Sequence, residues 1–243
     1  MHVAILGLGP SVNQYLELTK RKGGRKAFCD ETWCINALGE VFQCDRIFHM
    51  DDVRIQQVRA DAKPESNIAR MLDWLKTTTA PVVTSRTHPD YPALQEFPLG
   101  EVLSRFPLGY MNNTAAYAVA YALWLFHVKH RSKKNKLTLF GMDYTYDNVE
   151  HAERGRACVE WWLGVAAEMG VEIAMPKTTS LMDAYHSMQG RYYGYDTVDL
   201  EFKNDGGLIT VTMTEIEKLP TAEEIEAAYN HSAPIAQQHV IPR

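Results

Sequence analysis

The chain has 243 residues, of which 46% are hydrophobic and 23% are charged, and its formal net charge is −5. This balance is typical of a globular protein with a sizeable core, and it excludes a chain that is disordered over most of its length. The negative net charge argues against a surface built wholly for nucleic acid, and leaves room only for a local basic patch.

The sequence shows no targeting or membrane segment. The apolar N-terminus lacks a basic region and soon reaches Gly9-Pro10, and the apolar stretch of residues 115–128 is too short to cross a bilayer. We therefore expect a cytoplasmic protein without a membrane span. The four cysteines form no C-x-x-C pair, so we expect free thiols.

The first part of the chain alternates predicted strands and helices. Strands are expected at residues 2–6, 27–36, 46–50, 81–85, 136–140 and 171–175, and helices at residues 12–21, on either side of Pro64, and at 113–130 and 151–169. Residues 86–111 are rich in proline and are expected to form an irregular connection. The alternation predicts an α/β fold: a mostly parallel, Rossmann-like sheet with helices on both faces.

The C-terminal part has a different pattern. Residues 196–203 and 208–213 alternate apolar and polar side chains around Asn-Asp-Gly-Gly, which predicts a β-hairpin, and a short acidic helix follows at residues 222–229. We therefore expect a nucleotide-binding domain at residues 1–190. Residues 191–243 are expected to be an appendage, serving homo-oligomerisation or contact with an acceptor.

A glycine turn follows the first predicted strand. Gly7 and Gly9 allow a tight turn, and the amides around Gly9 and Ser11 lie at a helix N-terminus, where N–H groups and the helix dipole favour a phosphate. Val12 takes the place of the third glycine of a dinucleotide-binding motif, so NAD is not expected. The alternative is an ordinary turn of an α/β protein.

Polar side chains also follow the second and third predicted strands. Asn36 would face the crevice beyond the strand ends, where its amide suits a base or ribose, although it could also be a turn residue. Asp51 and Asp52 could hold a divalent cation such as Mg²⁺, or they could begin a helix and cap its amides.

A second group of candidates follows the strand at residues 136–140. Asp143 is expected at the crevice, and the phenols of Tyr144 and Tyr146 could donate to a departing phosphate, although such tyrosines often serve packing. His151 stands at the start of a long predicted helix, where a neutral imidazole can accept a proton. Its alternative role is that of an ordinary surface residue.

One segment is strongly basic. It runs from Lys129 to Lys136, and it is either a solvated loop after a helix or a contact for a polyanion such as nucleic acid.

The order of these motifs resembles bacterial lipooligosaccharide sialyltransferases and the wider set of proteins with their modified Rossmann fold, which includes archaeal hydroxymethyl-dihydropterin diphosphokinases. The resemblance covers about residues 2–184. The matching motifs are the glycine turn with Pro10 and Ser11, Cys34-Ile35-Asn36, the helix opening at Asn112-Asn113-Thr114, Gly141-Met142-Asp143-Tyr144, His151 and Met175-Pro176.

This resemblance implies roles for individual residues. Gly7, Gly9, Ser11, Asn36, Asn113, Thr114 and Asp143 would hold a nucleotide-sugar donor, Tyr144 and Tyr146 would contact its phosphate, and His151 would be the general base. Leu8 replaces an asparagine of the sialyltransferases, which leaves the donor sugar open. Asp51 and Asp52 are more similar to the metal-binding strand end of the pterin kinases.

Three hypotheses follow. The first is a glycosyltransferase that uses a nucleotide-activated sugar, with a glycan, a small molecule or a modified base in nucleic acid as acceptor. The second is a Mg²⁺-dependent diphosphate transfer enzyme. The third is a nucleotide-binding protein without catalysis.

Overall fold

The computed structural model describes residues 1–131, 134–145, 147–185, 192–195 and 198–228. The strands are β1 (His2–Leu6), β2 (Glu31–Ile35), β3 (Arg46–Phe48), β4 (Val82–Thr84), β5 (Leu94–Glu96), β6 (Lys136–Phe140), β7 (Glu172–Ala174), β8 (Val198–Asp205) and β9 (Leu208–Glu215). The helices are α1 (Val12–Lys22), α2 (Arg25–Phe28), α3 (Leu38–Val41), α4 (Val53–Ala62), α5 (Asn67–Leu75), α6 (Leu99–Arg105), α7 (Thr114–Lys129), α8 (Val149–Glu168), the 3₁₀ helix η1 (Leu181–Asp183) and α9 (Ala222–Ala228).

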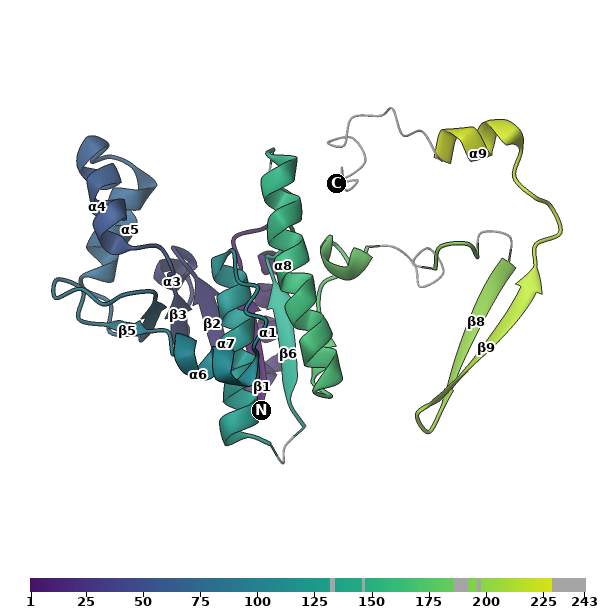
Figure 1. Cartoon of the computed structure of the whole chain (residues 1–243), viewed down its shortest axis with the longest axis horizontal. Coiled ribbons are helices and arrows are strands. Elements are labelled where there is room, and N and C mark those ends of the chain that lie inside the picture. Colours follow the sequence, from purple (N-terminus) through teal and green to yellow (C-terminus); the bar gives the residue numbers. More distant parts are fainter. Residues whose placement is uncertain (132–133, 146, 186–191, 196–197, 229–243) are drawn as a thin grey trace.

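The main sheet has seven parallel strands in the order β5-β4-β3-β2-β1-β6-β7 (Figure 1). From β1 the chain proceeds strand by strand to β5 at one edge, and then returns to place β6 on the other side of β1. The border between β1 and β6 is therefore the point at which the direction of winding reverses. This topology confirms the predicted α/β fold with a parallel, Rossmann-like sheet.

Helices cover both faces of the sheet because successive strand residues point to opposite sides. In β1, Val3 and Ile5 belong to a core shared with α6, α7 and α8. Ala4 and Leu6 face the other way and pack with Tyr15 of α1. Helix α7 has eight buried residues, which accords with its nearly continuous apolar sequence. The sheet thus holds α7 and α8 side by side over one face.

Two local expectations were wrong. Residues 86–111 are not wholly irregular, because they contain β5 and α6. Only Leu94 of β5 is buried, so this three-residue strand shows no alternating pattern. In contrast, Val102 of α6 and its C-cap residue Phe106, four positions later, are both buried. Residues 25–28 form the helix α2, so the second strand begins at Glu31 instead of residue 27.

The C-terminal strands form a separate antiparallel hairpin (Figure 1). One of its faces is apolar. The register places Leu200 opposite Met213 and Phe202 opposite Val211, so these four side chains share a face. Val211 is 44% exposed and Met213 is 60% exposed. On the β8 side, Phe202 is partly buried and stacks on Tyr192, with 5.4 Å between the ring centroids. Two-stranded hairpins are marginally stable alone, and exposed apolar side chains such as those of β9 are typical of an interaction surface.

We expect this hairpin to mediate self-association, because β9 carries no charged side chain from Leu208 to Thr214, whereas β8 carries Asp199, Glu201, Lys203 and Asp205. Uncharged edge strands are the ones that pair with another chain. Truncation after Gly194 should therefore lower the number of chains per particle, which is the molar mass measured by light scattering divided by the mass of one chain. The substitution Val211→Lys in the full chain should have the same effect, and a full-length protein that is already monomeric would contradict the expectation.

None of the helices in the described part of the chain combines the length and the apolar character that crossing a membrane requires. The four cysteines form no disulfide in the structure, and Cys29, Cys34 and Cys158 are buried.

Candidate functional site

A cavity of about 490 Å³ lies at the carboxyl ends of the central strands. Its lining comes from the segments after β1, β2, β3 and β6 and from the first turns of α7 and α8: Gly7, Leu8, Ile35, Asn36, Asp51, Asn112, Asn113, Thr114, Ala115, Gly141, Met142, Tyr144, His151, Arg154 and Gly155. In open α/β sheets, ligands bind at the carboxyl ends of the strands where the winding reverses. The cavity occupies this position, since residues after β1 and β6 both line it.

The glycine turn is locked against the segment that follows β6. Gly9 N donates to Gly141 O at 2.7 Å, and the Ser11 hydroxyl accepts from Gly141 N at 2.7 Å. A Cβ at Gly7 would lie 2.5 Å from Gly141 O, and a Cβ at Gly141 would lie 2.0 Å from Gly7 O. The glycines are therefore required for the close approach of two backbones, which shapes the floor of the cavity.

Three of the predicted ligand-binding residues take part in these contacts between the glycine turn and the segment after β6, and they do not line the cavity. The Asp143 carboxylate accepts from Ser11 N at 2.7 Å and is 2% exposed. Ser11 is buried too, and a Cβ on Gly9 would lie 2.6 Å from Asp143 Oδ2. The Ser11 amide that was predicted to hold a phosphate thus has an internal acceptor. Gly9, Ser11 and Asp143 therefore hold the residues that line the cavity in place, without lining it themselves.

Asn113 lines the cavity but uses its amide within the protein. Its Oδ1 accepts from Ala116 N at 2.9 Å and caps α7, while its Nδ2 donates to Gly155 O of α8 at 3.0 Å. Asn112 makes a parallel bond, from its Nδ2 to Arg154 O at 3.0 Å. The two asparagines therefore fasten the start of α7 to α8.

The start of α7 faces the cavity. Thr114 and Ala115 are its first residues and both line the cavity, and no acidic residue lies in this turn. First-turn N–H groups have no acceptor within their own helix, and the helix dipole makes this end favourable for an anion. Of the two helix N-termini, the one that faces the cavity is therefore that of α7, and not that of α1 after the glycine turn.

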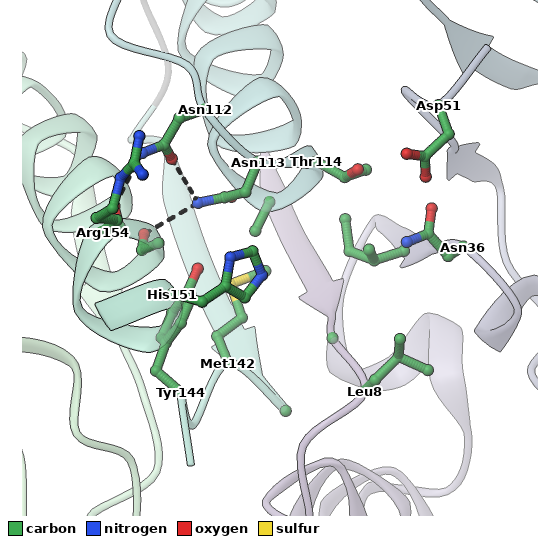
Figure 2. A pocket seen from close by; sticks show the side chains of 15 residues that line it. Leu8, Asn36, Asp51, Asn112, Asn113, Thr114, Met142, Tyr144, His151 and Arg154 are labelled. Carbon is green, nitrogen blue, oxygen red and sulfur yellow. Dashed lines mark hydrogen bonds between the residues drawn. The ribbon is translucent and has the colours of Figure 1, made fainter. Parts of the chain in front are cut away.

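One wall of the cavity carries the predicted catalytic residues (Figure 2). His151 is the third residue of α8, whose cap Asn148 accepts from His151 N at 3.0 Å. Figure 2 shows its imidazole directed into the cavity beside Tyr144 and Met142. Tyr144 has a left-handed φ of 49°, which is rare for a bulky side chain and is typical of functional sites.

Gly155 makes room for the tyrosine ring. A Cβ there would lie 2.8 Å from Tyr144 Cε1. The structure therefore brings Tyr144 and His151 to one wall, while Tyr146 lies outside the described residues.

The opposite wall is formed by residues that follow β2 and β3 (Figure 2). Asn36 has a left-handed φ of 51°, and its Oδ1 accepts from His49 Nδ1 at 3.1 Å. Asp51 lies above Asn36 in Figure 2 and also lines the cavity. The structure therefore places Asn36 at the crevice beyond the strand ends, as predicted.

Asp51 and Asp52, predicted as a pair of metal ligands, do not act together. Asp52 caps α4, since its Oδ1 accepts from Arg54 N at 2.9 Å, and its carboxylate also pairs with the Arg54 guanidinium. These bonds to Arg54 lower the pKa of Asp52 to about 2. Among the residues that the structure describes, no three His, Cys, Asp or Glu side chains come together in a group able to hold a metal ion. The donor set thus does not fit the predicted Mg²⁺ site, and the helix-cap alternative holds for Asp52.

The two aspartates should differ in their effects on stability. Asp52→Ala removes a helix cap and is expected to lower the free energy of unfolding in urea by about 1 kcal/mol at pH 7. Because the pKa of Asp52 is lowered on folding, this difference should persist above its ordinary pKa and shrink as the pH falls toward 2. Asp51→Ala should leave stability unchanged. Equal losses for both variants would contradict these assignments.

The described residues of the basic segment from Lys129 to Lys136 lie at the end of the sheet opposite to the cavity. The segment joins the end of α7 to the start of β6, whereas the cavity lies at the start of α7 and beyond the end of β6. The five residues of β6 span about 16 Å, and this length separates the start of the strand from the end that faces the cavity. Ser132 and Lys133 are outside the described residues. We therefore do not assign this segment to the acceptor position.

Several lining residues were not predicted. Arg154 and Gly155 follow His151 by three and four positions, so helical spacing alone places them on its side of α8. The Arg154 side chain is 70% exposed and lies 3.8 Å from the carboxylate of Glu150. Leu8 and Ile35 add apolar surface to the lining. Their positions at the ends of predicted strands could have indicated that they face the crevice. His49, buried behind Asn36, gave no signal in the sequence.

Comparison of the chain with protein-family models, with curated proteins and with solved structures finds no significant match.

Proposed function

We propose that the protein is a glycosyltransferase that uses a nucleotide-activated sugar. The observation that carries this proposal is the cavity at the reversal point of the sheet, with Asn36 and Asp51 on one wall and Tyr144 and His151 on the other. Such a cavity offers polar contacts for a nucleotide on one side and a proton acceptor on the other.

The walls suggest an orientation for the donor. The nucleoside would lie toward Asn36 and Asp51, where an amide and a carboxylate can bond a base or ribose. The phosphate would face the first turn of α7 at Thr114, with the Tyr144 hydroxyl as a further donor. The sugar would then lie near His151.

The proposed reaction is a direct displacement. His151 accepts the proton of the acceptor hydroxyl, and the oxygen forms a bond to the anomeric carbon. The bond from that carbon to the phosphate oxygen breaks, and the nucleotide departs with the electron pair. Donors aimed at the developing phosphate charge stabilise this transition state. Direct displacement inverts the configuration at the anomeric carbon.

The second candidate, a Mg²⁺-dependent diphosphate transfer enzyme, has less support. Its predicted metal ligand Asp52 is engaged by Arg54 and does not line the cavity. A nucleotide-binding protein without catalysis would share the cavity, and only turnover separates it from a transferase.

A thermal-shift screen with nucleotides and nucleotide sugars, with and without Mg²⁺, tests the proposal. Binding at a ligand concentration of 100 Kd raises the free energy of unfolding by about 2.7 kcal/mol. We expect a nucleotide sugar to raise Tm in wild type and much less in Asn36→Ala. The exposed variant Asp73→Ala, on α5, serves as the control. Absence of any shift with every nucleotide would contradict the proposal.

A further inference from the structure

His49 is a buried histidine beside the cavity that the proposed reaction does not use. It follows β3, is 1% exposed and does not line the cavity itself. Its Nδ1 lies 3.1 Å from Asn36 Oδ1, while its Nε2 has no hydrogen-bond partner among the described residues. The ring therefore contacts the site through Asn36.

The protonation of His49 follows from these contacts. Burial lowers the pKa of the ring, which favours the neutral form. A neutral ring carries one N–H, and placing it on Nε2 would bury a donor without an acceptor, which costs free energy. The proton is thus on Nδ1, and His49 donates to Asn36.

This bond determines which end of the Asn36 amide faces a ligand. Because Oδ1 is bound by His49, the Nδ2 amino group is the end left toward the cavity, as Figure 2 shows. The left-handed φ of 51° holds the backbone of Asn36 in an uncommon conformation at the same point. Without the bond to His49, the Asn36 side chain could rotate by 180° and turn either its N–H donors or its acceptor oxygen toward a ligand.

We propose that His49 is a positioning residue, which fixes the Asn36 amide so that it presents N–H donors to an acceptor atom of the nucleotide. Asp51, on the same wall, supplies the opposite polarity and accepts from an N–H or hydroxyl group. Together they would bind a ligand edge that carries an acceptor next to a donor. This inference rests on the proposed function, because it assigns the nucleotide to this wall.

The test is a double-mutant cycle on nucleotide affinity. Titrations with UMP, CMP, GMP and AMP identify the mononucleotide that wild type binds best, and its Kd is then measured for His49→Leu, Asn36→Ala and the double variant. We expect His49→Leu to weaken binding roughly tenfold, since a misoriented partner leaves a hydrogen bond unmade. In the Asn36→Ala background, the same substitution should have almost no effect, because its partner is gone.

A conservative variant guards against misfolding. The Nδ2 of asparagine can take the place of His49 Nδ1, so His49→Asn should restore most of the affinity that His49→Leu loses. Independent effects of His49→Leu and Asn36→Ala would overturn the inference while leaving the proposed function intact. Failure of wild type to bind any mononucleotide or nucleotide sugar would instead contradict the proposed function.

Discussion

Replacing His151 by alanine is expected to lower kcat by roughly 10²-fold or more, because the acceptor hydroxyl loses its proton acceptor. The imidazole lies on the wall opposite Asn36 and Asp51, so nucleotide affinity should stay close to that of wild type. The increase of kcat with pH that a general base produces should also disappear. The measurements are initial rates of nucleotide release across a pH series and nucleotide titrations.

The matched control is His127→Ala. His127 lies in the last turn of α7, at the end of the helix remote from the cavity, and its substitution should leave kcat unchanged. Undiminished turnover in His151→Ala would show that this histidine is a surface residue, and the mechanism would lose its base.

Replacing Gly9 by alanine is expected to disrupt the floor of the cavity. The new Cβ would lie 2.6 Å from Asp143 Oδ2 and 2.9 Å from Gly141 O, so the carboxylate or the turn must move. Overpacking of this kind costs about 1–3 kcal/mol. Displacement of Leu8 and Gly7, which line the cavity, should also weaken nucleotide binding by roughly tenfold, equivalent to about 1.4 kcal/mol.

Gly164→Ala provides the comparison. A Cβ at Gly164 of α8 meets nothing within 4 Å, and alanine favours a helix, so stability should be equal or higher. Urea unfolding and nucleotide titration measure both effects. Wild-type stability and affinity in Gly9→Ala would contradict the lock between the glycine turn and the segment after β6.

The fold could be predicted because each long element carries its own pattern. The alternation of short apolar runs with helical stretches predicts a parallel sheet, and the structure has one. Strand β5 could not be predicted, because its pairing with β4 buries one side chain, Leu94. Packing between elements, and not local sequence, makes this segment a strand.

The site could be predicted only in part, for a different reason. The sequence shows which residues follow a strand but not where their side chains turn. Asn36 and Tyr144 follow strands and line the cavity, whereas Asp143 folds back onto the Ser11 amide. Asp51 and Asp52 are adjacent, yet only Asp51 lines the cavity. These outcomes depend on long-range hydrogen bonds and on helix caps that form with the fold.

The assignment of this cavity as the site of sugar transfer is tested most directly by a crystal structure of the protein with the nucleotide sugar that raises Tm most. We predict the nucleoside against Asn36 and Asp51, the phosphate at the first turn of α7, and the anomeric carbon on the side of His151. A nucleotide bound elsewhere, or one whose sugar points away from His151, would contradict the assignment of this cavity as the site of sugar transfer.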